Sequence, residues 1–140
     1  MKKSISILGS TGTIGLNSLK IFGTKKNLFR FNIFAADKNY KLICMQIKKY
    51  KPRIFIVHNL KVFEKIKKKF KKNKVNIINS IDSKKNLFKN SDITIAAIPG
   101  IAGLKPTIEL TKKSKKILIA NKESIICGWN LIKKAALKNK

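Results

Sequence analysis

The sequence has 140 residues, of which 33 are Lys or Arg and 6 are Asp or Glu, so its formal net charge is +27. This length allows one domain with a sizeable core and excludes a large two-domain enzyme. Hydrophobic residues make up 44% of the chain, which excludes a wholly disordered protein and leaves most of the charge for the surface.

Short apolar runs rich in β-branched residues alternate along the chain with longer segments of helical period. Such near-continuous apolar runs are typical of parallel strands buried on both faces. Apolar residues at helical spacing, with lysines between them, predict helices over 40–50, 61–74 and 124–137. The pattern predicts one doubly wound, Rossmann-like α/β domain over residues 1–140, with six strands in a mostly parallel sheet alternating with helices. The expected strands are 5–8, 31–36, 53–57, 75–78, 93–98 and 117–120.

A glycine-rich segment, Gly9-Ser10-Thr11-Gly12-Thr13-Ile14-Gly15, follows the first strand directly and opens a helical stretch that runs to Phe22. We call residues 9–15 the glycine turn. Glycines three apart permit a tight turn, close approach of the backbone to a pyrophosphate and close packing of the helix, whose N-terminus offers N–H groups to an anion. The position between strand and helix predicts a dinucleotide site. The alternative is a βα turn that binds nothing.

The end of the second strand carries polar residues that bear on the cofactor. Asp37 lies 22 residues after Gly15, where an acidic residue normally binds the ribose 2′-hydroxyl of NAD. Lys38 could instead pair with the 2′-phosphate of NADP, and Asn39 could add an amide donor. Chemistry alone leaves the choice of cofactor open at these residues, and a polar turn without a ligand is the third interpretation.

Two later segments also end strands. In 96–107, small residues would let a flat ring lie against the backbone at the carboxyl edge of the sheet. The side chains of Asn121, Lys122 and Glu123 could orient a nicotinamide and anchor an anionic substrate. Asn121 could equally be a helix N-cap, with Glu123 in the first turn of that helix.

The segments 7–15, 96–107 and 119–124 together resemble the N-terminal part of the 1-deoxy-D-xylulose 5-phosphate reductoisomerase family, and the resemblance covers essentially the whole chain. It implies the NADPH-binding domain of an enzyme of non-mevalonate isoprenoid biosynthesis. The family rearranges its phosphorylated small-molecule substrate and reduces it to 2-C-methyl-D-erythritol 4-phosphate. It uses NADPH and a divalent metal, Mg or Mn, and forms a homodimer.

The resemblance also implies roles for individual residues of this sequence. Asp37 stands where the family more often has a small residue, and Pro99 where it usually has an aliphatic one. The implied ligands are Thr11, Gly12, Thr13 and Ile14 for the cofactor phosphates, Lys38 and Asn39 for the adenosine ribose phosphate, Asn121 and Glu123 for the other half of the cofactor, and Lys122 for the substrate.

No catalytic or metal-binding residue is predicted in this chain. The family's Asp-Ser-Glu metal motif is expected beyond the last helix, so we expect the metal-binding and C-terminal domains to lie outside these residues and the chain to be inactive alone. The six carboxylates show no paired spacing for a metal. His58 is expected to be a surface residue, and Cys44 and Cys127 to be buried and unpaired.

Two other functions remain open. A semialdehyde or acyl-phosphate type NADP dehydrogenase has a similar glycine turn, but it needs a Cys nucleophile with a His base. A basic protein that binds polyanions is the second, although the lysines are spread along the chain and no nucleic-acid motif is present. The absence of a signal segment and of a long apolar run predicts a cytoplasmic protein without a membrane partner.

Overall fold

The computed structural model describes residues 1–82 and 88–138. Its centre is a six-stranded sheet with the order β4-β3-β2-β1-β5-β6, in which every neighbouring pair is parallel. The predicted doubly wound, Rossmann-like class is confirmed. The strands are β1 (Lys3–Leu8), β2 (Phe29–Ala36), β3 (Ile54–Val57), β4 (Asn76–Ile78), β5 (Ser91–Ala96) and β6 (Ser114–Ile119).

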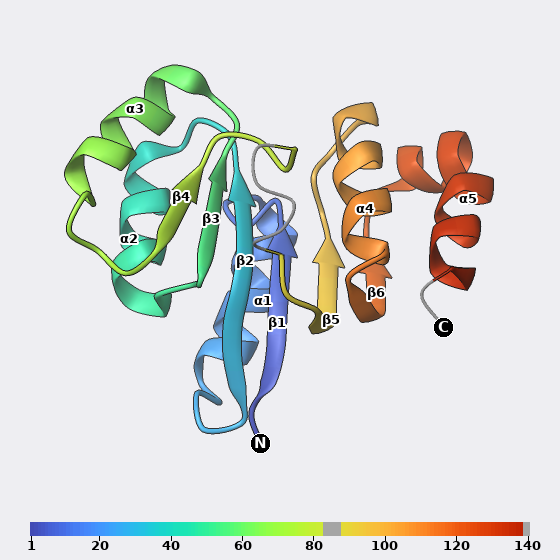
Figure 1. Cartoon of the computed structure of the whole chain (residues 1–140), viewed down its shortest axis with the longest axis horizontal. Helices are drawn as coiled ribbons and strands as arrows, with labels where there is room; N and C mark the ends of the chain where they lie inside the picture. Colours follow the sequence, from blue (N-terminus) through green and yellow to red (C-terminus); the bar gives the residue numbers. More distant parts are fainter. Residues whose placement is uncertain (83–87, 139–140) are drawn as a thin grey trace.

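Helices cover both faces of the sheet (Figure 1). Leu19 of α1, Ile43 of α2 and Ile66 of α3 belong to one apolar cluster with the sheet, whereas Leu110 of α4 belongs to a second cluster. The helix α5 packs mainly against α4 at the β6 side of the molecule. The helices are α1 (Thr13–Gly23), α2 (Tyr40–Tyr50), α3 (Leu60–Lys69), α4 (Leu104–Thr111) and α5 (Lys122–Leu137), with a short 3-10 helix at Ile101–Gly103.

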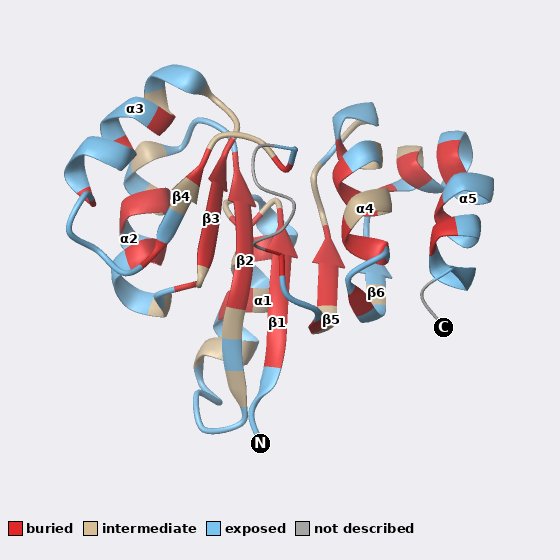
Figure 2. Ribbon diagram, viewed as in Figure 1, coloured by how far each residue is buried: buried red, intermediate tan, exposed pale blue. Residues whose placement is uncertain are grey.

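The core consists of the middle strands, which Figure 2 shows as the most continuously buried part of the molecule. Phe34 and Phe55 are fully buried beneath the α1–α3 layer, and Ile33 and Ile54 are fully buried on the opposite face. Side chains on both faces of one strand are buried because helices or connecting segments cover both. This explains why the strands appear in the sequence as unbroken apolar runs.

The order of the strands in the sheet reverses at the boundary between the neighbouring strands β1 and β5. From β1 it proceeds outward to β2, β3 and β4, and it then returns to pair β5 with the other side of β1. At such a boundary, the connections that leave the carboxyl ends of the two strands run to opposite faces of the sheet. This opens a crevice between them, where open α/β sheets bind ligands. The glycine turn follows one of these strands and residues 97–100 follow the other.

Several sequence expectations differ from the structure. The strand expected at 93–98 is β5, Ser91–Ala96, because the chain turns away after the Ala97 N–H donates to the Leu8 carbonyl at 2.9 Å. Cys44 is buried as expected, but Cys127 is exposed on α5 because it lies on the helix face turned away from α4 and the sheet. Neither cysteine forms a disulfide.

None of the helices in the described part of the chain has the length and apolar character needed to cross a membrane.

Candidate functional site

The first glycine of the glycine turn fixes the backbone between two strands. Gly9 has φ +81°, a region that favours glycine, and a Cβ at this position would lie 2.5 Å from the Ala97 carbonyl oxygen. The N–H groups of Gly9 and Ser10 both donate to the Ala35 carbonyl at 2.9 Å. The turn is therefore held at the end of β2 and against the chain that leaves β5.

The other two glycines have different roles. A Cβ on Gly15 would meet the backbone of Gly9 and would lie 2.7 Å from Ser10 Cα, so Gly15 permits α1 to begin directly against the turn. A Cβ on Gly12 would find only the Gly9 oxygen, at an ordinary 3.5 Å. The protein itself thus tolerates a side chain at Gly12, and the exposed glycine there leaves its backbone open to a ligand.

The N-terminus of α1 is suited to an anion. Gly12 is its N-cap residue, and among the described residues no side chain caps the helix. By contrast, Asn39, Asn59 and Asn121 accept hydrogen bonds from the first turns of α2, α3 and α5. The first N–H groups of α1 have no acceptor within the helix, and the positive end of its dipole adds to the attraction for phosphate. Thr13 and Ile14, in this first turn, are exposed.

A buried pair that the sequence analysis missed supports the glycine turn from below. Ser10 Oγ donates to Gln46 Oε1 at 2.7 Å, and Gln46 Nε2 donates to the Ser10 carbonyl at 2.8 Å. Both residues are fully buried. The signal was a glutamine beside Ile43 and Ile47 on the apolar face of α2, where an amide needs a polar partner.

A cavity of about 230 Å³ lies at the carboxyl edge of the sheet, where β1 and β5 diverge. We call it the switch-point cavity. It combines a backbone that can approach a ligand closely with the exposed carboxylate of Asp37 and the ring of His58. Its lining residues are Gly9, Thr11, Gly12, Ala36, Asp37, His58, Ala97, Ile98 and Pro99.

His58 corrects the expectation of a surface histidine, because it is half-buried in this cavity after β3. Burial lowers the pKa of His58 below its ordinary value, and the nearby charge of Asp37 acts in the opposite direction. Its Nε2 atom is buried and makes no hydrogen bond within the described residues. A neutral ring therefore faces the predicted ribose-binding carboxylate.

The structure brings the other predicted adenosine ligands to the same edge. Lys38 and Asn39 are exposed between β2 and α2, next to Asp37. The Asn39 side-chain oxygen accepts from the Leu42 N–H at 3.1 Å, so its amide nitrogen is the group that remains for a ligand. A carboxylate, an ammonium and an amide donor thus succeed one another at the end of β2.

Asn121 joins the two later segments of the site. Its amide nitrogen donates to the Ile98 carbonyl and, at 2.8 Å, to the Gly100 carbonyl, while its oxygen accepts from the Ser124 N–H at 3.0 Å. The residue is only 4% exposed, so its side chain is occupied in fixing residues 98–100 beside the switch-point cavity. The N-cap interpretation of Asn121 is confirmed, and its contact with the nicotinamide half of a cofactor stays a prediction.

The remaining predicted residues lie at the start of α5. Lys122 is exposed and Glu123 is half-buried in the first turn of the helix. A glycine at position 103 is required nearby, because a Cβ there would collide with the Asn121 amide and the Ile98 carbonyl. These contacts place the Asn-Lys-Glu segment and the small-residue segment at one end of β5 and β6.

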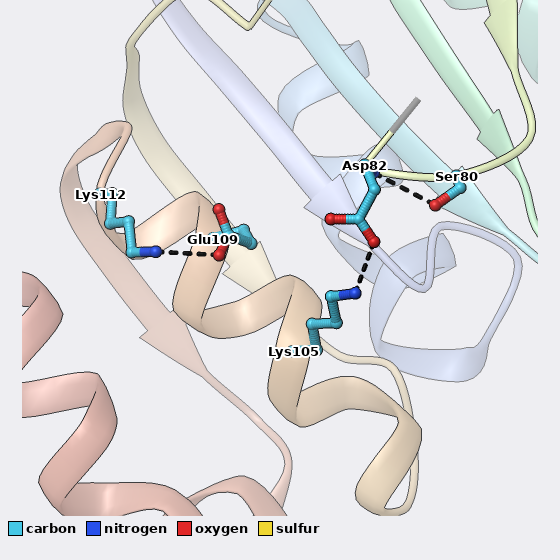
Figure 3. Close-up of polar contacts among 5 residues, drawn as sticks. All are labelled: Ser80, Asp82, Lys105, Glu109 and Lys112. Atoms are coloured by element: carbon cyan, nitrogen blue, oxygen red, sulfur yellow. Dashed lines mark hydrogen bonds and ion pairs between the residues drawn. The ribbon is translucent and has the colours of Figure 1, made fainter. Parts of the chain in front are cut away.

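The ion pairs drawn in Figure 3 are surface contacts rather than a reactive group. Lys105 of α4 contacts Asp82 at 2.5 Å, which links the segment after β4 to α4. Lys112 and Glu109 form a second pair, at 2.9 Å, within and just beyond α4. Exposed pairs of this kind contribute little to stability. Within the described ranges, no three His, Cys, Asp or Glu side chains come together as a metal site would require.

The sequence of this chain is similar to one family of known proteins. The family model described as 1-deoxy-D-xylulose 5-phosphate reductoisomerase matches residues 5–128. The protein of that name from Pelagibacter ubique (strain HTCC1062) is 43% identical over 141 residues, which cover 99% of this chain and 36% of the relative. Its counterpart from Buchnera aphidicola subsp. Schizaphis graminum is 36% identical, with the same two coverages of 99% and 36%. The chain spans about a third of the length of these curated relatives.

Solved structures give the same picture of the fold. The 1-deoxy-D-xylulose 5-phosphate reductoisomerase from Zymomonas mobilis in complex with NADPH matches with a TM-score of 0.88 at 24% identity, covering 99% of this chain and 37% of that one. A DOX-P reductoisomerase in complex with NADPH, fosmidomycin and magnesium matches with a TM-score of 0.87 at 26% identity, covering 98% and 34%.

Proposed function

Because its sequence matches that family model over residues 5–128, the chain belongs to the 1-deoxy-D-xylulose 5-phosphate reductoisomerase family, and we propose that it is the NADPH-binding part of such an enzyme. The observation that supports this most strongly is the glycine turn, with an uncapped helix N-terminus at the switch point of a parallel sheet. The complete enzyme would convert 1-deoxy-D-xylulose 5-phosphate to 2-C-methyl-D-erythritol 4-phosphate in non-mevalonate isoprenoid biosynthesis.

The phosphates of the cofactor belong, in this proposal, at the start of α1. The backbone at Gly12, Thr13 and Ile14 supplies N–H donors, and Thr11 and Thr13 can add hydroxyl groups. Gly12 is the critical residue, because its open backbone allows a phosphate to approach within hydrogen-bond distance. Ser10 and Gln46 hold the turn in the binding conformation before the cofactor arrives.

The adenosine ribose belongs at the end of β2. The ammonium of Lys38 and the amide nitrogen of Asn39 would hold the 2′-phosphate of NADPH. Asp37 opposes that phosphate electrostatically, whereas its carboxylate suits a free 2′-hydroxyl. Two favourable donors against one exposed carboxylate make NADPH the preferred cofactor, with a smaller margin over NADH than a site without Asp37 would have.

The nicotinamide half belongs beside residues 97–100 and the start of α5. Asn121 positions the backbone there, and Glu123 lies at the same helix end. The exposed Lys122 would attract the anionic, phosphorylated substrate. When bound, NADPH supplies a hydride to that substrate, and the residues of this chain hold the ring and exclude water from one of its faces.

Within the described residues, no cluster of three or more His, Cys, Asp or Glu side chains was found that could hold a divalent metal of the kind the family uses. The proposal for this chain is limited to holding the cofactor and part of the substrate.

The dehydrogenase alternative finds no support in the geometry. Cys127 lies on α5, which follows β6, whereas His58 follows β3. Strands β2, β1 and β5 lie between β3 and β6, so about 19 Å of sheet separates the two elements. A nucleophile and its base must lie within hydrogen-bond reach.

Fluorescence titration with NADPH and NADH tests the proposal. We expect saturable binding of NADPH that is tighter than that of NADH. Lys38→Gln should weaken NADPH binding about tenfold, the effect of losing one charge-assisted contact, and leave NADH binding unchanged. Asp37→Gly should widen the preference for NADPH.

The matched control is Lys48→Gln, which removes an exposed lysine near the C-terminal end of α2, the helix that follows Lys38. It should change neither affinity. Tighter binding of NADH in the unmodified chain, or equal losses in both lysine variants, would overturn the assignment of Lys38 as a 2′-phosphate ligand.

A further inference from the structure

A second and larger cavity, of about 580 Å³, lies at the opposite edge of the sheet from the glycine turn. It is formed where β2, β3 and β4 begin: the Arg53 N–H donates to the Phe31 carbonyl at 3.2 Å, and the Asn76 N–H donates to the Arg53 carbonyl at 3.0 Å. We call it the amino-edge cavity. Its lining residues are Phe31, Lys51, Pro52, Arg53, Lys72, Asn73, Lys74 and Val75.

All of the charged residues that line the amino-edge cavity are basic. Four of its eight residues are Lys or Arg and none is Asp or Glu. Lys51, Lys72 and Lys74 are exposed, and none of them forms an ion pair with a carboxylate in the described ranges. The three lysines thus bring positive charge to the cavity from the end of α2 and from the connection into β4, and within the described ranges no carboxylate pairs with them.

The arginine in this lining is unusual for the chain. Of the 33 basic residues, 31 are lysine and only Arg30 and Arg53 are arginine. These two are close enough to interact: partial burial lowers the pKa of Arg53, and the positive charge of Arg30 lowers it further. An anion bound at Arg53 would offset this repulsion between the two guanidinium groups.

Arg53 is also fixed in position. Its Nε–H donates to Asn32 Oδ1 at 2.9 Å, and Asn32 Nδ2 donates to Ser91 Oγ at 2.8 Å. Asn32 and Ser91 are both buried in the sheet. A guanidinium held by a buried network loses less conformational entropy when it binds an anion than a free lysine does.

We propose that the amino-edge cavity binds the phosphate or diphosphate group of a small molecule. Arg53 provides the fixed donor and Lys51, Lys72 and Lys74 provide the surrounding charge. Phe31, Pro52 and Val75 form an apolar wall that can accept the organic part of such a ligand. The six residue steps from Phe31 in β2 to Asp37 just beyond its end span about 20 Å, so this site is separate from the switch-point cavity.

Titration calorimetry with inorganic pyrophosphate, at low and moderate salt, tests the proposal on the whole chain. We expect one saturable event from this cavity that weakens with salt. The variant K51Q/K72Q/K74Q should weaken it at least tenfold. The control K116Q/K133Q/K134Q removes the same charge from exposed lysines of β6 and α5 and should change it less than threefold.

Two further variants test the role of the arginine and the location of the bound pyrophosphate. Arg53→Lys keeps the positive charge but loses the planar set of guanidinium N–H donors, and should weaken pyrophosphate binding severalfold. Gly12→Ala tests whether pyrophosphate binds at the glycine turn instead, and should leave this event unchanged.

Three results would overturn the proposal: no saturable binding, equal weakening in the cavity and control variants, or loss of the event in Gly12→Ala with retention in K51Q/K72Q/K74Q. Thermal unfolding of each variant without ligand establishes that it is folded. If Arg53→Lys fails to fold, the comparison of the two triple variants decides, because all of their substituted lysines are exposed.

Discussion

Replacing Gly12 by alanine should greatly weaken NADPH binding while the fold stays intact. The substitution is compatible with the backbone, because Gly12 has φ −81° and ψ 172°, which alanine adopts readily. The added methyl would have one neighbour in the protein, the Gly9 oxygen at 3.5 Å. We therefore expect the free energy of unfolding to change by less than about 1 kcal/mol.

The effect on binding follows from the position of that methyl. If the cofactor phosphates bind over the Gly12 backbone, as proposed, the methyl would stand between them and that backbone. Loss of one hydrogen bond to a charged group costs about 1.5–3 kcal/mol, which corresponds to binding about 10- to 150-fold weaker. NADPH fluorescence gives the affinity and urea denaturation gives the stability of the same sample.

Gly15→Ala is the matched contrast. Its Cβ would lie 2.7 and 2.8 Å from the Cα and carbonyl carbon of Ser10, and these are backbone atoms that cannot move alone. Overpacking of this kind destabilises a protein by about 1–3 kcal/mol. Two results would refute the separate roles given to the two glycines. One is that Gly12→Ala binds NADPH as tightly as the unmodified chain, and the other is that both substitutions destabilise the fold equally.

Three other substitutions test contacts around the sheet. Gln46→Leu should lower the free energy of unfolding by about 1–3 kcal/mol in urea denaturation, because it leaves Ser10 without its buried partner. Hydrogen bonds from Lys115 and from the Ser4 backbone and hydroxyl hold the pKa of Asp92 well below its ordinary value. The ionised Asp92 therefore stabilises the fold fully at pH values above its ordinary pKa, and this stabilisation is lost as the pH falls toward the lowered pKa. Asp92→Asn should therefore be less stable than the unmodified chain at neutral pH, with a smaller difference near pH 2, in thermal unfolding. Burial lowers the pKa of His58, so stability should fall as the pH drops below about 6.5, and His58→Gln should reduce this loss; an unchanged pH profile would contradict it.

The strands could be predicted from the sequence because burial on both faces leaves a continuous local signal. Ile54 to Val57, for example, are four fully buried residues in a row. Boundaries were less accurate where a hydrogen bond to another strand decides the end, as at Ala97. The helix α4 was not singled out, since it is short, follows two glycines and contains Pro106.

The buried polar contacts could not be predicted in the same way. Ser6 Oγ lies 2.6 Å from Ser91 Oγ, 85 residues away, because β1 and β5 are neighbours. Such a pair has no local signature, and its partners are known only once the strand order is known. The same holds for Asn121, whose helix-cap pattern is local but whose bonds to residues 98 and 100 depend on the placement of β5 beside β6.

Net charge was the least informative part of the sequence, because lysines at +27 give every surface some attraction for anions. The structure distinguishes two edges of one sheet that would attract anions by different means. At the glycine turn, on the carboxyl edge, the donors are backbone N–H groups at the start of a helix that no described side chain caps. At the amino edge they are side-chain cations around a fixed arginine. Removal of Lys51, Lys72 and Lys74 should therefore weaken binding at the amino edge, whereas a single methyl on Gly12 should be enough to weaken phosphate binding at the glycine turn.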